Sequence, residues 1–335
     1  TSFSTMTSAG EFVRLNLSGY HLCRDEGDPE LPEIHNLIEI PQDATPRIEL
    51  IVHEYKDYVL SDYDINSQIY PVQPSLSKSQ NPEDIEFMIN EDAYMKNEML
   101  EKPMAEVKIL GQMRALRLAN LLIRPINYNP VAGILRIYTN IEVNIHMDNG
   151  NHEKTAEIKK NYQSPYFDVL YNQISNYQSE NRSDDMINDP VTYAIVANSS
   201  FNGYLDEFIE WKTQKGYHVI VGYTNEIGSS ASSIKNFVHN LYNNPEDNVA
   251  PPSFLLLVGD TNQIPASYSS GGHVSDLDYG DVSGDMMPEI LYGRFSAQTP
   301  MHLEPQIEKT MEYEKFEMED PSFLGEVVMI SGVDA

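Results

Sequence analysis

The spacing of apolar residues changes near the middle of this chain of 335 residues, and this change limits the folds it can adopt. Up to about residue 150, apolar and polar residues alternate, which is typical of half-buried β-strands. After residue 160, short apolar runs such as FLLLV at 254–258 alternate with segments of helical spacing. Since the length allows two or three domains, we expect domains built in different ways.

The first part predicts an antiparallel β-sandwich or open barrel over residues 1–160. Leu135, Ile137 and Ile145 fall on one face of an extended strand, while polar residues occupy the other. Similar stretches read RIELIVHEY, AEVKILGQM and LRLANLLIRPI, and turn residues occur at 128–133. Residues 74–102 lack the alternation and predict a long excursion with a short helix.

The second part, residues 191–335, predicts an α/β domain. Its expected strands read TYAIVAN, HVIVGY, FLLLVGD, ILYGRFS and EVVMISG. Helices are expected from about residue 203, around Ile234, and after Thr299 and Pro300. Strands that are apolar throughout indicate a parallel sheet covered on both faces. The expected fold class is therefore α+β with several domains.

A polar segment separates the two parts, within residues 161–190. Helical spacing before it predicts a helix with these residues on one face: Phe167, Leu170, Tyr171, Ile174 and Tyr177. The helix should fray into QSENRSDDMINDP, whose Pro190 resists helix continuation. We expect an interdomain linker here.

Charge and composition restrict the partners. With 51 acidic and 22 basic residues, the formal net charge of −29 disfavours nucleic acid and anionic membranes and favours cations and basic partners. The apolar fraction of 41% is that of a folded chain, but no apolar run is long enough to span a membrane. The first residues lack the features of a signal peptide, so any signal is expected to have been removed. The single cysteine, Cys23, excludes internal disulfides and multi-thiolate metal sites.

An acidic loop, SDLDYGDVSGDMMPE at 275–289, follows the third strand of the second part, which ends at Asp260. Asp260 could be a phosphoacceptor, although the accompanying acids and lysine of such sites cannot be placed, or part of a nucleotide site, which lacks its glycine-rich loop. It could also cap a turn beside solvated acids. Calcium is the fourth reading, because it binds carboxylate and carbonyl oxygens from flexible loops, and Asp285 and Glu289 can converge here.

Several segments, taken in order, are similar to known proteins. DEFIEWKTQKGYHVIVGYTNE, SSIKNFVHNLY, FLLLVGDTNQIP and LEPQIEKTMEYEK resemble the first part of the catalytic domain of gingipains, secreted bacterial cysteine endopeptidases with a caspase-like three-layer α/β fold. GDPELP at 27–32 and INYNPVAGILRIYTNIEV at 126–143 resemble their propeptide. The resemblance implies an all-β propeptide at 1–160, a helix and activation linker at 161–190, and the first part of the peptidase domain at 191–335.

The resemblance also implies a structural calcium ion. Its expected ligands are the Asp260 carboxylate, the Val282 carbonyl, Asp285, the Met287 carbonyl and Glu289. The remaining acids of the loop, Asp276, Asp278 and Asp281, are then expected to be solvated.

The catalytic histidine and cysteine of such enzymes are expected downstream of Ala335, so the resemblance assigns no catalytic residue to this chain. Acidic neighbours disfavour the thiolate of Cys23. Ser269, His273 and Asp276 have triad composition, but only geometry identifies a triad, and His273 is expected to be an exposed loop residue. His218 should begin a strand and His239 should lie on a helix, both with structural roles.

We therefore expect the zymogen, or a fragment of it, of a secreted or cell-surface bacterial cysteine endopeptidase. The resemblance places activation between Arg182 and Ser183, with an ordinary linker arginine as the alternative. It assigns inhibition of the specificity pocket to Arg117, or to Arg114, against two solvent-facing arginines. The expected partners are the rest of the catalytic domain and peptide or protein substrates, while specificity for Arg or Lys stays open. The alternative function is a non-catalytic secretion component or a calcium-stabilised binding protein.

Overall fold

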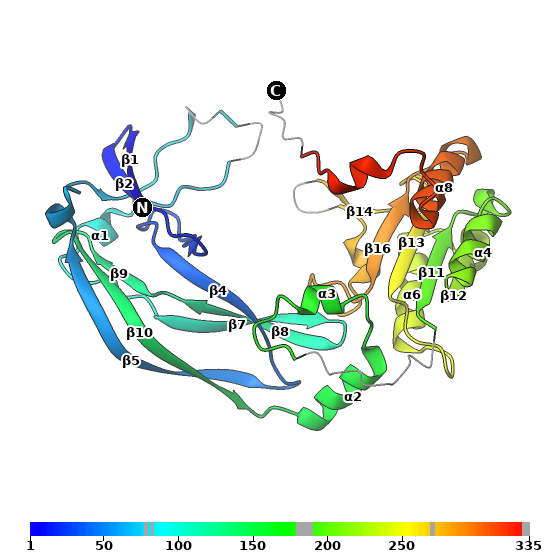
Figure 1. Cartoon of the computed structure of the whole chain (residues 1–335), viewed down its shortest axis with the longest axis horizontal. Helices are drawn as coiled ribbons and strands as arrows, with labels where there is room; N and C mark the ends of the chain where they lie inside the picture. Colours follow the sequence, from blue (N-terminus) through cyan, green and yellow to red (C-terminus); the bar gives the residue numbers. More distant parts are fainter. Residues whose placement is uncertain (77–79, 82–83, 179–189, 269–271, 330–335) are drawn as a thin grey trace. The chain divides into compact units, whose positions relative to one another are not determined.

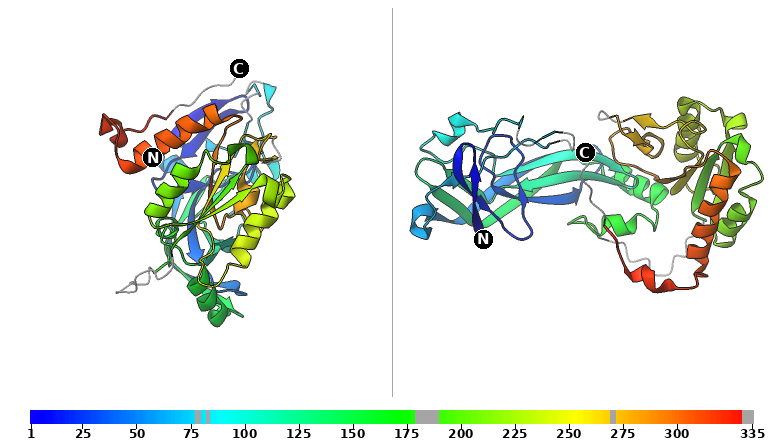
Figure 2. Two further views of the ribbon diagram at one scale, coloured as in Figure 1. Left: turned by 90° about the vertical axis from the view of Figure 1, so that its right-hand side faces the viewer. Right: turned by 90° about the horizontal axis from the view of Figure 1, so that it is seen from above.

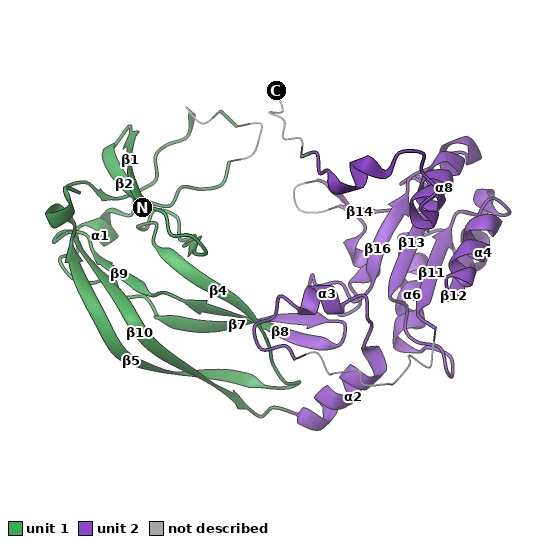
Figure 3. Ribbon diagram, in the orientation of Figure 1, with its two compact units in different colours: residues 1–109, 119–150, 329–335 green, residues 110–118, 151–328 purple. Residues whose placement is uncertain are grey.

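A computed structural model describes residues 1–76, 80–81, 84–178, 190–268 and 272–329 of the chain (Figure 1). Two compact units can be distinguished (Figure 3). Unit 1 consists mainly of residues 1–109 and 119–150, and unit 2 consists of residues 110–118 and 151–328. A short excursion of the first half of the chain therefore belongs to the second unit.

The described residues of unit 1 form three β-sheets. One contains β1 (Ser2–Thr7), β2 (Gly10–Leu15) and β6 (Gln68–Ile69), in that order. The second runs β3 (His21–Leu22), β4 (Pro32–Glu39), β8 (Leu116–Ile123) and β7 (Ala105–Met113), and the third runs β5 (Thr45–Val59), β10 (Ile134–Asp148) and β9 (Ile126–Asn129). Apolar side chains from the second and third sheets, among them Ile38, Leu121 and Val143, share one core. This part is built from β-sheets, as expected, but not all of its strand pairs are antiparallel, because β2 and β6 run parallel.

The excursion predicted over 74–102 contains a single helical turn, α1 (Glu91–Tyr94), in its described part. Asn90 caps it, because its side chain accepts a hydrogen bond from the Ala93 amide. A 3₁₀ turn, η1 (Leu60–Tyr63), follows β5.

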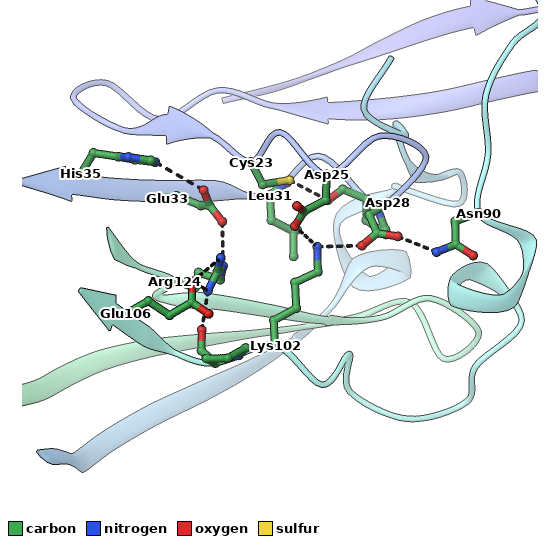
Figure 4. A network of polar contacts seen from close by, with 12 residues as sticks. Cys23, Asp25, Asp28, Leu31, Glu33, His35, Asn90, Lys102, Glu106 and Arg124 are labelled. Carbon is green, nitrogen blue, oxygen red and sulfur yellow. Dashed lines mark hydrogen bonds and ion pairs between the residues drawn. The ribbon is translucent and has the colours of Figure 1, made fainter. Parts of the chain in front are cut away.

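Ion pairs fix the acidic stretch around GDPELP in unit 1 (Figure 4). The Lys102 ammonium lies 2.7 Å from carboxylate oxygens of both Asp25 and Asp28. Arg124 contacts Glu33 at 2.8 Å and Glu106 at 3.1 Å. Lys102 and Arg124, from later in the chain, thus pair with Asp25, Asp28 and Glu33.

Unit 2 contains a four-stranded parallel sheet between two layers of helices (Figures 1 and 2). Its strand order is β12 (His218–Tyr223), β11 (Thr192–Ala197), β13 (Phe254–Val258) and β16 (Leu291–Phe295). Helices α4 (Asp206–Gln214) and α8 (Pro300–Lys315) pack on one face, and α6 (Ala231–Asn243) and α7 (Leu277–Gly280) pack on the other. The alternation along β11 divides its side chains between the two cores, with Ile195 in one and Val196 in the other. Four of the five predicted strands are confirmed.

The fifth strand, expected at 326–332, is not formed in its described part. Residues 326–329 have no strand assignment, and the exposed fractions of Val327, Val328 and Met329 are 87%, 81% and 91%. A strand needs a neighbouring backbone for its hydrogen bonds, and among the described residues no β-ladder includes this segment. An apolar run alone is therefore not enough to form a strand.

Smaller elements of unit 2 surround the sheet. They are α5 (Thr224–Ile227), η3 (Ser199–Phe201), η4 (Pro321–Gly325) and a two-stranded hairpin of β14 (Ser267–Tyr268) and β15 (Val274–Ser275). None of the helices in the described residues combines the length and apolar character that a membrane crossing requires.

The segment between the two predicted domains differs from the prediction. Helix α2 (His152–Tyr162), capped by Asn151, was not anticipated, and the helix expected through Tyr177 is only the short α3 (Asp168–Tyr171) followed by turns. The run of Asn172, Ser175 and Asn176 has low helix propensity, which explains the early end. Phe167, Tyr171 and Ile174 are nevertheless buried, within unit 2.

Candidate functional site

The tip of the β7–β8 hairpin belongs to unit 2, although both strands begin or end in unit 1 (Figure 3). Its turn consists of Arg114 and Ala115, and Arg114 has a left-handed backbone with φ of 51°. For a residue other than glycine, this conformation costs roughly 1–3 kcal/mol. The side chain is also only 2% exposed. The contacts of Arg114 must therefore offset both the backbone strain and the free-energy cost of burying its charge.

The guanidinium group of Arg114 is surrounded by backbone carbonyl groups. Its Nε donates to the Tyr162 carbonyl at 2.6 Å, Nη1 donates to those of Pro252 and Glu289 at 2.7 and 3.0 Å, and Nη2 donates to that of Pro251 at 3.0 Å. Burial lowers the pKa of Arg114, while nearby tyrosines and Glu289 oppose that shift. The side chain stays protonated in spite of this, because a guanidinium does not lose its proton in proteins.

This cluster lies at the amino-terminal ends of two strands of the sheet. Pro251 and Pro252 precede β13, and Glu289 precedes β16. The rings of Phe167 and Tyr242 lie 5.2 and 5.7 Å from the guanidinium carbon, within the range of cation–π contacts. The sheet edge thus binds the tip through carbonyl dipoles and aromatic rings.

A second contact joins the tip to the acidic loop. The Gln112 amide donates to Asp285 Oδ2 at 2.5 Å. A Cβ atom on Gly111 would lie 2.1 Å from the same oxygen, so a side chain at that position would displace the Asp285 carboxylate. On the other side of the turn, the Tyr171 hydroxyl accepts from the Ala115 amide and donates to the Met113 carbonyl. Side chains from two other segments, Asp285 of the acidic loop and Tyr171 of α3, therefore hold the turn.

The acidic loop folds around two of its own carboxylates. Glu289, only 2% exposed, accepts hydrogen bonds from the amides of Val282 and Ser283 and from the Ser283 hydroxyl. Asp281 accepts from the amides of Gly284, Asp285 and Met286 at 2.8, 3.1 and 3.0 Å. Burial raises the pKa of Glu289, although these hydrogen bonds favour its ionised form. Backbone N–H groups thus stabilise the negative charges that are crowded in this loop.

Two expectations about the other acids of the loop were wrong. Asp281 is buried, and Asp276 forms a two-pronged ion pair with Arg294 at 2.9 and 2.7 Å. Both were expected to be solvated, but amide donors and a guanidinium compensate the loss of water. Asp278 is exposed, as expected.

The predicted calcium ligands are only partly brought together. Val282, Asp285, Met287 and Glu289 share the acidic loop, whereas Asp260 follows the other end of β13. Because Phe254 pairs with Leu291 and Val258 with Phe295 in parallel register, Glu289 lies level with position 252, and the eight residues from there to Asp260 span roughly 26 Å at about 3.3 Å per residue. The Asp260 carboxylate accepts hydrogen bonds from the Gln298 side chain, the Thr261 amide and the Ser296 hydroxyl, and these lower its pKa.

The described conformation does not fit a calcium ion at the predicted ligands. Within the described residues, no group of three or more acidic, histidine or cysteine side chains converges as metal ligands would. The carboxylates of Asp285 and Glu289 already face N–H donors. The calcium site stays a prediction.

The remaining candidates are placed as follows. Cys23 is buried, its Sγ donates to the Pro29 carbonyl and accepts from the Leu31 amide, and burial raises its pKa to about 11 (Figure 4). His273 is exposed, His218 begins β12 and His239 lies on α6, as expected. Arg117 is half-buried on β8. Arg182, Ser183 and Ser269 lie outside the described residues.

Sequence reasoning missed most of the tip contacts. It named Arg114 only as an alternative to Arg117 and did not consider Gly111, Gln112 or Tyr171. A glycine within a strand pattern often marks a close backbone approach, and Gly111 in AEVKILGQM was such a signal. The four carbonyl acceptors could not be predicted, because they are backbone groups that every residue has.

Comparisons with known proteins agree along the chain. The family model Propeptide_C25 matches residues 3–184, and that of Peptidase family C25 matches residues 187–335. Lys-gingipain W83 of Porphyromonas gingivalis is 35% identical over 331 residues, which are 98% of this chain and 19% of that protein. Gingipain R2 of the same species is 25% identical over 323 residues, which are 92% of this chain and 41% of that protein.

Solved structures match in part. One, described as structural insight into zymogenic latency of gingipain K, has 32% identity and a TM-score of 0.41, covering 44% of this chain and 80% of that chain. Another, the complex of Porphyromonas gingivalis RgpB pro- and mature domains, has 20% identity and a TM-score of 0.42, and the match covers 53% of this chain and 87% of that chain. Since both scores are low, the sequence matches carry the comparison. The present chain spans about a fifth of the length of the Lys-gingipains it matches.

Proposed function

The chain belongs to peptidase family C25 and contains that family's propeptide followed by the start of its peptidase domain, and we propose that the whole protein is a secreted cysteine endopeptidase made as a zymogen. The observation that carries the proposal is the order of the two family matches, 3–184 and then 187–335. We place the catalytic histidine and cysteine beyond Ala335. Peptides or proteins are the proposed substrates, and the cell exterior or surface is the proposed location.

Unit 2 would then be the first part of a caspase-like domain. Its parallel sheet with helices on both faces supports this proposal. Cysteine catalysis needs a thiolate, a base and oxyanion donors. Cys23 is unsuited as the nucleophile, because burial keeps its thiol protonated at neutral pH. A non-catalytic role in secretion or binding is not favoured, because both peptidase-family models match in order.

Activation would cut the chain between Arg182 and Ser183. The boundary between the two family matches, at 184–187, supports this position. The test is to express the full-length protein and identify the new N-terminus that appears during maturation. We expect Ser183 in the wild type, its absence in Arg182→Ala, and normal processing in the matched variant Arg24→Ala, whose side chain is exposed. Normal processing of Arg182→Ala would refute this position.

Inhibition would require a basic propeptide side chain in the specificity pocket, and Arg117 is the proposed residue. Arg114 is a weaker candidate, because four carbonyl groups already bind its guanidinium. Arg117→Ala should raise the peptidase activity of the uncut protein, and unchanged latency would reject the assignment. A calcium ion held by Asp260, Val282, Asp285, Met287 and Glu289 completes the proposal, and it would require a rearrangement that brings Asp260 to the loop.

A further inference from the structure

The carbonyl groups around Arg114 form a built site rather than a chance contact. Pro251 and Pro252 have no amide N–H, and both are buried before β13 with their carbonyl groups directed at the guanidinium. The Glu289 carbonyl adds a third acceptor. Without the arginine, these acceptors would be left without that donor inside the protein, which costs free energy.

The chemistry of the site selects a guanidinium group. Arginine has five N–H donors in one rigid plane, and four hydrogen bonds from three nitrogen atoms use that plane here. An ammonium group has only three donors on a point charge and cannot reproduce this arrangement. The flanking rings of Phe167 and Tyr242 add contacts to the planar group.

The contacts of the tip cross the position of the proposed cut. Arg114 and Gln112 precede the linker, whereas Pro251, Asp285 and Glu289 follow it. A second segment before the linker reinforces them. The ring of Tyr162 stacks on Tyr242 at 4.9 Å, the Ser253 hydroxyl donates to that of Ser164 at 2.9 Å, and Tyr166 packs edge-on against Phe254 at 4.6 Å. Cutting the chain between 179 and 189 removes none of these contacts.

We propose that Pro251, Pro252 and Glu289 form a guanidinium-binding site whose ligand is Arg114, and that this site keeps the propeptide bound after the linker is cut. The inference rests on the proposed zymogen function for its biological meaning, but not for its physical basis. It assigns Arg114 to docking, so that Arg117 remains for the specificity pocket. Linker cleavage alone then does not separate the two pieces, and a later event must break the tip contacts.

The test uses this chain with residues 179–189 replaced by the recognition sequence of a site-specific protease, so that it does not depend on the natural cleavage position. After cutting, size-exclusion chromatography and the exchange of a labelled N-terminal piece measure dissociation. We expect the wild-type pieces to elute together. Arg114→Gly, which removes the guanidinium and relieves the left-handed backbone, should dissociate about 10- to 100-fold faster. The matched variant Arg47→Ala, at an exposed ion pair, should behave as the wild type.

Chemical rescue tests the ligand class directly. Millimolar ethylguanidinium should slow dissociation of the Arg114→Gly pieces, whereas ethylammonium should not. If Arg114→Gly fails to fold, Arg114→Lys takes its place. It should also dissociate faster, because one ammonium group cannot donate to all four carbonyl groups. Unchanged dissociation in a folded Arg114→Gly or Arg114→Lys protein would overturn the proposal. Equal rescue by ethylguanidinium and ethylammonium would overturn it as well. Failure of Ser183 to appear in the full-length protein would instead reject only the Arg182 assignment.

Discussion

Arg114 and Lys212 are both buried cations of unit 2, and their surroundings compensate them differently. Carbonyl groups surround Arg114. Lys212 on α4 instead donates to the Glu314 carboxylate of α8 at 2.5 Å, and its ammonium lies over the rings of Tyr193 and Phe208. Glu314 also accepts from Trp211 and Lys215. One carboxylate therefore joins two helices.

Glu314→Gln should destabilise unit 2 by about 2–3 kcal/mol at neutral pH, because it leaves Lys212 buried without its counter-charge. Burial alone would raise the pKa of Glu314, but the hydrogen bonds from Lys212, Lys215 and Trp211 outweigh it and lower the pKa. A lowered pKa means that this stabilisation is complete above about pH 4.5 and is lost as the pH falls through the folded-state value.

Urea unfolding of the chain at several pH values checks this prediction. The difference in unfolding free energy between the wild type and Glu314→Gln should shrink below about pH 4.5. Glu312→Gln, an exposed position on the same helix, serves as the control and should change little. A difference that stays constant down to acid pH would contradict the role of the ion pair.

Cys23 should react slowly with iodoacetamide in the folded chain. Because burial raises its pKa to about 11, its thiolate fraction at pH 8 should be at least about 100-fold below that of an unfolded cysteine. Mass spectrometry of the labelled protein, with and without urea, measures the two rates. Comparable rates would show that the thiol is accessible and reactive.

At the scale of elements, the acidic loop depends on Asp281 for its shape. Three amide groups donate to that carboxylate, and two of the residues involved, Gly284 and Met286, have left-handed backbones with φ of 78° and 73°. Asp281→Ala should cost about 2 kcal/mol of stability, whereas Asp278→Ala, at an exposed position of the same region, should cost less than about 0.5 kcal/mol. Equal effects in thermal or urea unfolding would mean that the amide contacts are unimportant.

The same loop allows a test of the calcium proposal. If calcium binds only the folded form, its removal with EGTA should lower the Tm of the chain, by mass action. Asp260→Asn should abolish the calcium dependence, because the proposed ligand set includes that carboxylate. A Tm that does not change between calcium and EGTA would show that backbone amides alone balance the charge of the loop.

The periodic elements could be predicted from sequence, and the irregular ones could not. FLLLV and HVIVGY form the expected parallel strands. Their runs of apolar, mostly β-branched or leucine residues are themselves the signal for a strand covered by helices. The helix α2, the short α3 and the absent strand at 326–329 depend on capping, packing and pairing partners that a local pattern does not contain. In the candidate site, the acids of 281–289 were visible in the sequence, but their amide donors and the carbonyl groups around Arg114 were not.

At the scale of the whole molecule, the family assignment and the hairpin tip are consistent with the proposed zymogen, in which a short part of the propeptide belongs to the second unit. Residues 110–118 leave the β-sandwich part of the sequence and belong to unit 2. Covalent continuity through the linker is therefore not the only connection between the segments before and after it. Release of the propeptide should require both cleavage and disruption of the tip.

The most direct test is the peptidase activity of the full-length protein before and after cleavage of the linker and removal of the propeptide. We predict that the uncut protein is nearly inactive on peptides with Arg or Lys before the scissile bond. Activity should appear once the propeptide has been removed, and a thiol-alkylating reagent should abolish it. A full-length protein that is equally active before cleavage, or inactive after complete removal of the propeptide, would contradict the account.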